Sequence, residues 1–117
     1  MNPDEMKART KRFALQAIRL SQGLPRNREA DVIGRQLLRS GTSLAANYRA
    51  ACRARSTSEF VSKLGVAEEE ADETLLWLEL LTDTGILPEV KGREIAKECE
   101  EILRIIVASI KTARDKR

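Results

Sequence analysis

Pairs of carboxylates at helical spacing are the first residues in this sequence that could do chemistry. Three pairs lie three residues apart: Glu69 and Asp72, Glu70 and Glu73, and Glu98 and Glu101. Helical nucleotide-hydrolysing enzymes collect Mg²⁺ with carboxylates at this spacing. Charged runs on helices are more often solvated faces or ion-pair partners, however, and Glu69 and Glu73 are expected to face away from the interior of the fold. The pairs alone are therefore weak evidence for a metal site.

The rest of the sequence lacks the residues that most catalytic sites need. It contains no histidine, which excludes the usual Ser-His-Asp and Cys-His catalysis and His-ligated metals. It also contains no glycine-rich phosphate loop and no nucleophile elbow. We therefore expect a protein that is not an enzyme, with no catalytic residue, no metal and no cofactor.

The two cysteines and the lengths of the apolar runs indicate the cellular compartment of the protein. Cys52 and Cys99 lie far apart without CxxC spacing, which is typical of two small buried thiols in a cytosolic protein. No apolar run approaches about 18 residues, and the first ten residues have no apolar signal region. The sequence therefore predicts a soluble, cytoplasmic protein that does not enter a membrane.

Basic side chains form the second group that could do chemistry. Residues 1–67 contain 13 Lys and Arg against 5 Asp and Glu, whereas residues 68–117 contain 8 against 13. Arginines recur at helical spacing over positions 35–53, and further cations lie on either side. Such a surface predicts contacts with the phosphates of RNA or DNA. Its candidate residues are Arg35, Arg39, Arg49, Arg53, Arg55 and Lys63, with Lys7, Lys11 and Arg12 nearer the start of the chain.

A second interpretation of the same arginines is ion pairing, within one subunit or between subunits. The candidate partners are Glu68, Glu69, Glu70, Asp72 and Glu73. We favour pairing for Arg49 and Arg53, because they lie near the turn that leads to these acids. Any nucleic-acid binding should involve mainly backbone phosphates, because no interleaved aromatic platform or zinc knuckle is present.

The elements that position these residues are predicted to be four helices, over about 3–22, 28–54, 57–83 and 89–114. Asn2 and Asn27 are candidate N-caps, and Ser56 forms a capping box with Glu59. Gly23 should end the first helix in the left-handed conformation, and Gly85 should end the third. Short connections make neighbouring helices antiparallel, so we expect an all-α, up-down-up-down four-helix bundle that forms a single domain over residues 1–117.

Two further features concern packing. Gly34 and Gly41 lie seven residues apart near the apolar stripe of the second helix, which suggests a close approach of another helix. The segment Leu75–Leu81 is apolar nearly all round, so it must be covered on more than one side. Either this helix is simply the most buried of the four, or it lies in an interface between subunits. The interface candidates are Val66, Glu69, Glu73, Leu76, Trp77 and Leu80.

The segment from Gly34 to Leu80 closely resembles the bacterial 23S rRNA-intervening-sequence proteins, a four-helix bundle family. The matching blocks are LLRSGTS (37–43), ANYRAACRARS (46–56) and EEEADETLLWLELL (68–81). The resemblance implies an antiparallel bundle, a homopentameric ring and an RNA-related role without an established activity. The family is also distantly similar to the accessory variability proteins of retroelements, pentamers that contact reverse transcriptase and nucleic acid through basic surfaces.

The leading hypothesis is therefore a ring-forming scaffold or adaptor that binds RNA or DNA through phosphate contacts. The alternative is a protein–protein interaction module, with reverse transcriptase or another protein as partner. In that module the arginines form ion pairs between subunits, and the protein does not bind nucleic acid.

Overall fold

Side-chain caps begin three of the four helices in the computed structural model, which describes residues 1–116. The helices are α1 (Pro3–Gln22), α2 (Arg28–Cys52), α3 (Thr57–Asp83) and α4 (Glu89–Asp115). Asn2, Asn27 and Ser56 each accept the backbone N–H three residues further on, at 2.8, 2.9 and 3.0 Å. Pro88 precedes α4 without a side-chain cap. The predicted caps are confirmed because a side-chain oxygen satisfies an otherwise free amide at each of these three starts.

Some details of the helix ends differ from the prediction. Gly23 has φ −88° and ψ −4°, so it is not left-handed, and its N–H instead bonds to carbonyls of the last turn. Gly85 is the glycine that takes positive φ, at 77°. The helix α2 ends at Cys52 rather than near 54, in a tight turn. The capping box is half formed, because the Glu59 carboxylate accepts the N–H of Arg55, at 3.4 Å, instead of that of Ser56.

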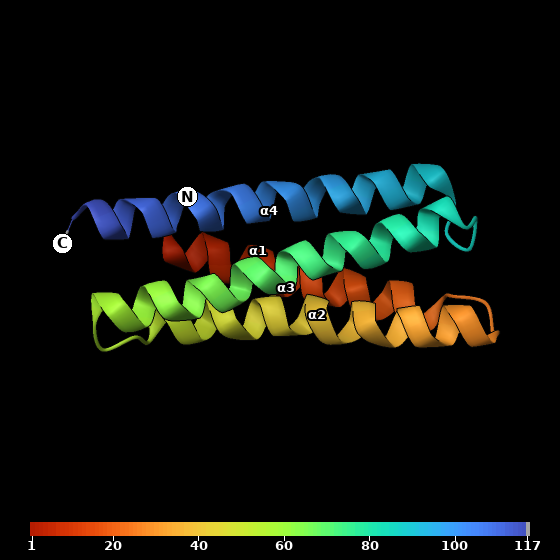
Figure 1. Cartoon of the computed structure of the whole chain (residues 1–117), viewed down its shortest axis with the longest axis horizontal. Coiled ribbons are helices and arrows are strands. Elements are labelled where there is room, and N and C mark those ends of the chain that lie inside the picture. Colours follow the sequence, from red (N-terminus) through yellow and green to blue (C-terminus); the bar gives the residue numbers. More distant parts are fainter. Residues whose placement is uncertain (117) are drawn as a thin grey trace.

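The four helices run up, down, up and down along a body of 48 × 20 × 19 Å (Figure 1). Each helix contributes buried apolar side chains to one shared core, and the described residues contain no strand. The largest fully buried side chains are Phe13, Met6, Leu37, Leu44, Leu64, Leu78, Leu81, Ile102 and Ile106. This confirms the all-α four-helix bundle. No helix within residues 1–116 is long and apolar enough to cross a membrane.

Small residues bring α1 and α2 close together. A Cβ placed on Gly41 would lie 2.8 Å from the Cβ of Ala17, closer than real Cβ contacts. One placed on Gly34 would lie 2.9 Å from a methyl carbon of Leu24, at the α1–α2 turn. The close approach predicted from the two glycines is therefore confirmed. Side chains on the outer edges of α1 and α2 consequently face each other across a narrow groove.

The contact between α1 and α4 is the sparsest of those between adjacent helices. Arg9 of α1 bridges this gap: its Nη2 donates to Glu98 at 2.7 Å and to Glu101 at 2.6 Å, and its Nε donates to Glu98 at 2.8 Å. The Arg9 side chain is 15% exposed. These ion pairs of Arg9, which we call the Arg9 clamp, therefore tie together the two adjacent helices whose backbones make the fewest close approaches.

Candidate nucleic-acid interface

Four cations flank a groove between α1 and α2 near the amino-terminal end of α1. Lys7 and Lys11 stand one turn apart on α1, whereas Arg49 lies in the last turn of α2 and Arg53 directly follows that helix. Two overlapping hollows of about 380 and 390 Å³ make up the groove. Besides the cations, its lining consists of Ala8, Ala14, Ala45, Ala46, Ala50 and Cys52. We call this surface the cationic groove.

The cationic groove holds little compensating negative charge. Its lining contains no carboxylate among the described residues. The Nζ of Lys7 lies 3.4 Å from Oδ1 of Asp4, an exposed residue of the same helix. No ion pair joins Lys11, Arg49 or Arg53 to a carboxylate of residues 1–116. Cations gathered over a floor of alanines create a positive potential with room for a chain of phosphates.

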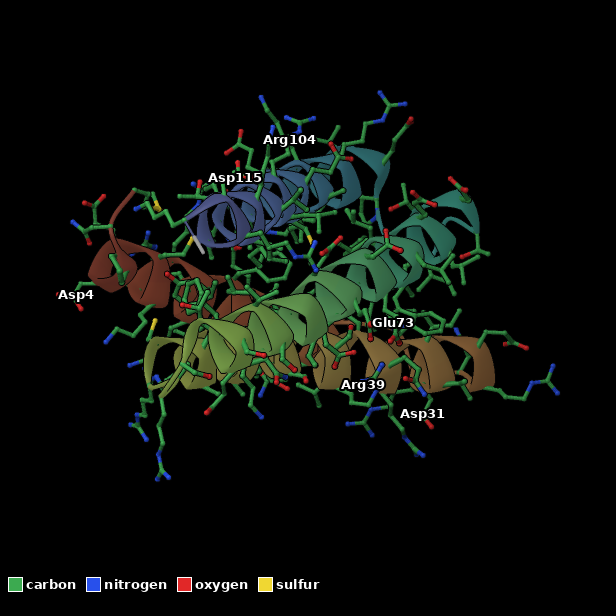
Figure 2. The ribbon with its side chains drawn as sticks, turned by 60° about the vertical axis from the view of Figure 1, so that its left-hand side comes forward. Asp4, Asp31, Arg39, Glu73, Arg104 and Asp115 are labelled. Carbon is green, nitrogen blue, oxygen red and sulfur yellow. The ribbon has the colours of Figure 1, made fainter. Side chains whose placement is uncertain are left out.

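The ion pairing expected for Arg49 and Arg53 falls on a different arginine within this chain. Figure 2 shows Arg39 of α2 and Glu73 of α3 turned toward one another. Arg39 donates to Glu70 at 2.9 Å and to Glu73 at 2.5 Å. Arg39 lies where α2 faces the acidic stretch of α3, whereas Arg49 and Arg53 turn toward α1. Within this chain the predicted ion pairs with α3 thus form at Arg39, and pairing of Arg49 and Arg53 with acids of another subunit stays a prediction.

The other predicted cations do not join one stripe. Arg35 is paired with Asp31 of its own helix at 2.8 Å, and both side chains are exposed. Arg55 lies in the α2–α3 turn, and Lys63 is half-buried on α3. Of the six predicted phosphate contacts, Arg49 and Arg53 therefore lie in the cationic groove, together with Lys7 and Lys11.

Two of the three carboxylate pairs that suggested Mg²⁺ bind arginines, whereas Glu69 and Asp72 of the third pair are exposed. Glu98 and Glu101 hold the guanidinium of Arg9, and the pKa of Glu98 is lowered by its hydrogen bonds to Arg9. Glu70 and Glu73 hold Arg39. Among residues 1–116, no group of three or more Cys, Asp or Glu side chains is placed to hold a metal ion. The arginine-bound carboxylates stabilise helix contacts.

The outer side of α3 carries the predicted interface residues. Val66, Leu76 and Leu80 are 40%, 45% and 37% exposed. Glu69 is also exposed, whereas Glu73 is bound to Arg39. Trp77 is half-buried rather than outward, and its Nε1 is buried with no hydrogen-bond partner among the described residues. We call Val66, Glu69, Leu76 and Leu80 the outer face of α3.

The two thiols differ in environment, although both were predicted to be buried. Cys99 is buried, its Sγ donates to the carbonyl of Ala71, and burial raises its pKa to about 12. Cys52 is half-buried and lines the cationic groove. Burial raises the pKa of the nearby Tyr48 phenol, and Cys52 adds to the effect. Cys99 is thus a core residue, and Cys52 is part of a surface.

Sequence reasoning missed two parts of this arrangement. No pattern in the sequence around Arg9 predicts its ion pairs with α4. Arg9 directly precedes the buried Thr10 on α1. The alanine floor left a clearer signal, because Ala46 and Ala50 alternate with Arg49 and Arg53 along one edge of α2. Small residues between cations indicate a groove only when the neighbouring helix is known.

Comparisons with known proteins agree with this architecture. A family model described as 23S rRNA-intervening sequence protein matches residues 5–108. A crystal structure from Bacteroides thetaiotaomicron, described as a protein of unknown function from the S23 ribosomal protein family, is 35% identical. It superposes with a TM-score of 0.89 over 95% of this chain and 99% of its own. No curated protein matches the chain.

Proposed function

The chain belongs to the 23S rRNA-intervening sequence protein family, and from this premise we propose that it is a non-enzymatic scaffold or adaptor that binds RNA or DNA through backbone phosphates. The observation that carries the proposal is the cationic groove, in which Lys11, Arg49 and Arg53 have no carboxylate partner within residues 1–116. Free cations in a groove bind phosphates by releasing the counterions that surround nucleic acid.

The shape and lining of the groove favour contacts that ignore base sequence. Its floor is alanine, and among residues 1–116 no amide side chain lines it to read a base edge. Lys7, Lys11, Arg49 and Arg53 offer four phosphate contacts per subunit. The proposed role is therefore to hold structured nucleic acid, in the cytoplasm, rather than to select a sequence.

We further propose that subunits assemble through the outer face of α3 into a ring, with a pentamer as the expected size. Leu76 and Leu80 expose apolar surface beside acidic side chains of α3, and the surface of the next subunit that receives them must lie outside the cationic groove, which stays open to phosphates. A head-to-tail ring requires two different, complementary surfaces. Repeating one groove around a ring also strengthens binding to a long nucleic acid.

Fluorescence anisotropy with a labelled RNA stem and a labelled DNA duplex tests phosphate binding. Affinity should fall steeply with salt, with a log–log slope of about −3 to −4 for each groove occupied. The double variant Arg49→Gln and Arg53→Gln should weaken binding to both nucleic acids and make the slope shallower by about two.

The matched control removes the same charge outside the groove. Arg28 and Arg35 are exposed and paired with acids of their own helix, so Arg28→Gln with Arg35→Gln should change the slope much less. Equal loss in both double variants would show that net charge, and not the groove, governs binding. No binding by the wild type at low salt would instead favour a protein–protein interaction module, in which the arginines serve subunit pairing.

A further inference from the structure

A further hollow, larger than either hollow of the cationic groove, lies next to it at the end of the bundle. Its volume is about 1000 Å³, and it lies between the start of α1, the α2–α3 turn and the last turns of α4. Phe60, Ile105 and Ala108 supply apolar surface, and Arg55 and Lys116 supply positive charge. We call this hollow the end dish.

The end dish exists because α1 is shorter than its neighbours. α1 has 20 residues, whereas α2, α3 and α4 have 25, 27 and 27. At about 1.5 Å per residue, this leaves roughly 8–10 Å of the bundle end uncovered by α1. Figure 1 shows α1 beginning short of the carboxyl end of α4. Side chains of α3 and α4 that a longer α1 would cover are therefore accessible at this end.

The end dish and the cationic groove are neighbours at the end of α2. Cys52, the last residue of α2, lines both of them, while Arg53 lines the groove and Arg55 lines the dish. Neither lining contains an Asp or Glu among the described residues. A single anionic ligand could thus pass from the groove into the dish without meeting a carboxylate of either lining.

The two surfaces differ in what they can bind. The groove offers cations above alanines, which suits phosphates, and no aromatic ring lines it among the described residues. The dish offers the ring of Phe60 and the side chain of Ile105 for the face of a base, and the hydroxyls of Ser109 and Thr112 for its polar edge. Arg55 and Lys116 can meet the phosphates on either side of that base.

We propose that the end dish receives an unpaired nucleotide of a strand whose neighbouring phosphates lie in the cationic groove. This inference rests on the proposed function and narrows its substrate class to structured nucleic acid with an unpaired extension beside a duplex. Base stacking on an aromatic side chain is tolerant of sequence, so any of the four bases should be accepted.

Anisotropy titrations of the full chain with two RNA ligands test the proposal. One ligand is a short blunt duplex, and the other is the same duplex extended by unpaired nucleotides at one end of one strand. The wild type should bind the extended duplex at least about fivefold more tightly. Ala108→Glu, which places a carboxylate in the dish, should abolish that preference and leave binding of the blunt duplex unchanged.

Val107→Glu is the matched control, because Val107 is the adjacent exposed residue and does not line the dish. It should keep the preference. A photoreactive base in the extension should also cross-link to residues 54–60 or 105–116. Equal affinity for the two duplexes, or cross-links only to the outer face of α3, would overturn this inference and leave the proposed function standing. Failure to bind either duplex would overturn the proposed function and this inference with it.

Discussion

The guanidinium of Arg9 and the carboxylate of Glu98 form a two-point contact across the α1–α4 seam, with N–O distances of 2.7 and 2.8 Å. Both side chains are largely shielded, being 15% and 30% exposed. Paired hydrogen bonds between charged groups are stronger than neutral ones and fix orientation as well as distance. This contact therefore sets how α1 lies against α4.

Removing the clamp should destabilise the fold more than removing a surface ion pair. We expect Arg9→Ala to lower the free energy of unfolding by about 2 kcal/mol, because Glu98 loses its partner and the buried stem of Arg9 loses its packing. Arg93→Ala, which breaks an exposed pair with Glu89 one turn away, should cost less than about 0.5 kcal/mol. Urea unfolding followed by circular dichroism measures both. Equal losses would contradict a special role for Arg9.

The same clamp predicts how stability depends on pH. Arg9 lowers the pKa of Glu98 below its ordinary value of 4.5, so the folded state favours the charged carboxylate. The resulting stabilisation is fully present above about pH 5 and is lost as pH falls through the lowered pKa. Glu98→Gln should therefore be less stable than the wild type at neutral pH, by about 1 kcal/mol, and the difference should shrink near pH 3. Glu94→Gln, an exposed change on the same helix, is the control.

Replacing either of two glycines by alanine should change the free energy of unfolding, but in opposite directions. A Cβ on Gly65, within α3, meets nothing within 4 Å, so Gly65→Ala should raise the free energy of unfolding by about 0.5–1 kcal/mol. A Cβ on Gly92 would lie 2.1 Å from Thr82 Oγ1 and 3.1 Å from Thr82 Cβ, so Gly92→Ala should lower it by about 1–3 kcal/mol.

Thermal or urea unfolding of both glycine variants checks these signs. Adding Thr82→Ala to the Gly92→Ala chain should recover part of the loss, because the hydroxyl and methyl that clash with the new Cβ are gone. If the Gly92→Ala chain were as stable as the wild type, α4 would not approach α3 as closely as the structure shows.

The outer face of α3 predicts an assembly that depends on two leucines. The double variant Leu76→Lys with Leu80→Lys should be monomeric if the proposed ring forms through this face, because two charges would have to be buried in its interface. Light scattering measures the mass, and the fluorescence of Trp77, the single tryptophan, should shift as the interface opens. Val32→Lys with Val90→Lys changes two exposed apolar residues elsewhere and should leave the mass unchanged. A monomeric wild type at micromolar concentration would refute the ring.

Local signals in the sequence predicted the fold well, because caps and helix spacing depend on residues close together in the chain. Asn27 and Ser56 cap α2 and α3 as expected, and Gly41 marks a close helix approach. The site was predicted less well. Whether Arg39 or Arg49 meets the acids of α3 depends on how far α2 is rotated about its axis, which no local pattern specifies.

The end dish illustrates the same limit. Phe60 lies on the apolar stripe of its helix, where spacing alone indicates a core position, whereas Ile105 lies beside the apolar stripe of its own helix. They line a surface hollow because α1 begins too late to cover them. Relative helix length, and not side-chain type, turns this part of the core into a candidate binding surface.

Because α1 is the shortest helix and closely approaches α2 but not α4, we expect it to detach from the bundle at the lowest free energy. Local openings of this kind release backbone amides to solvent while the rest of the fold remains intact. Amides of α1 should therefore exchange with deuterium faster than those of α3, which packs on both α2 and α4. Lys7 and Lys11 move with α1, so a phosphate chain that bridges them to Arg49 and Arg53 should slow this exchange by favouring the closed state.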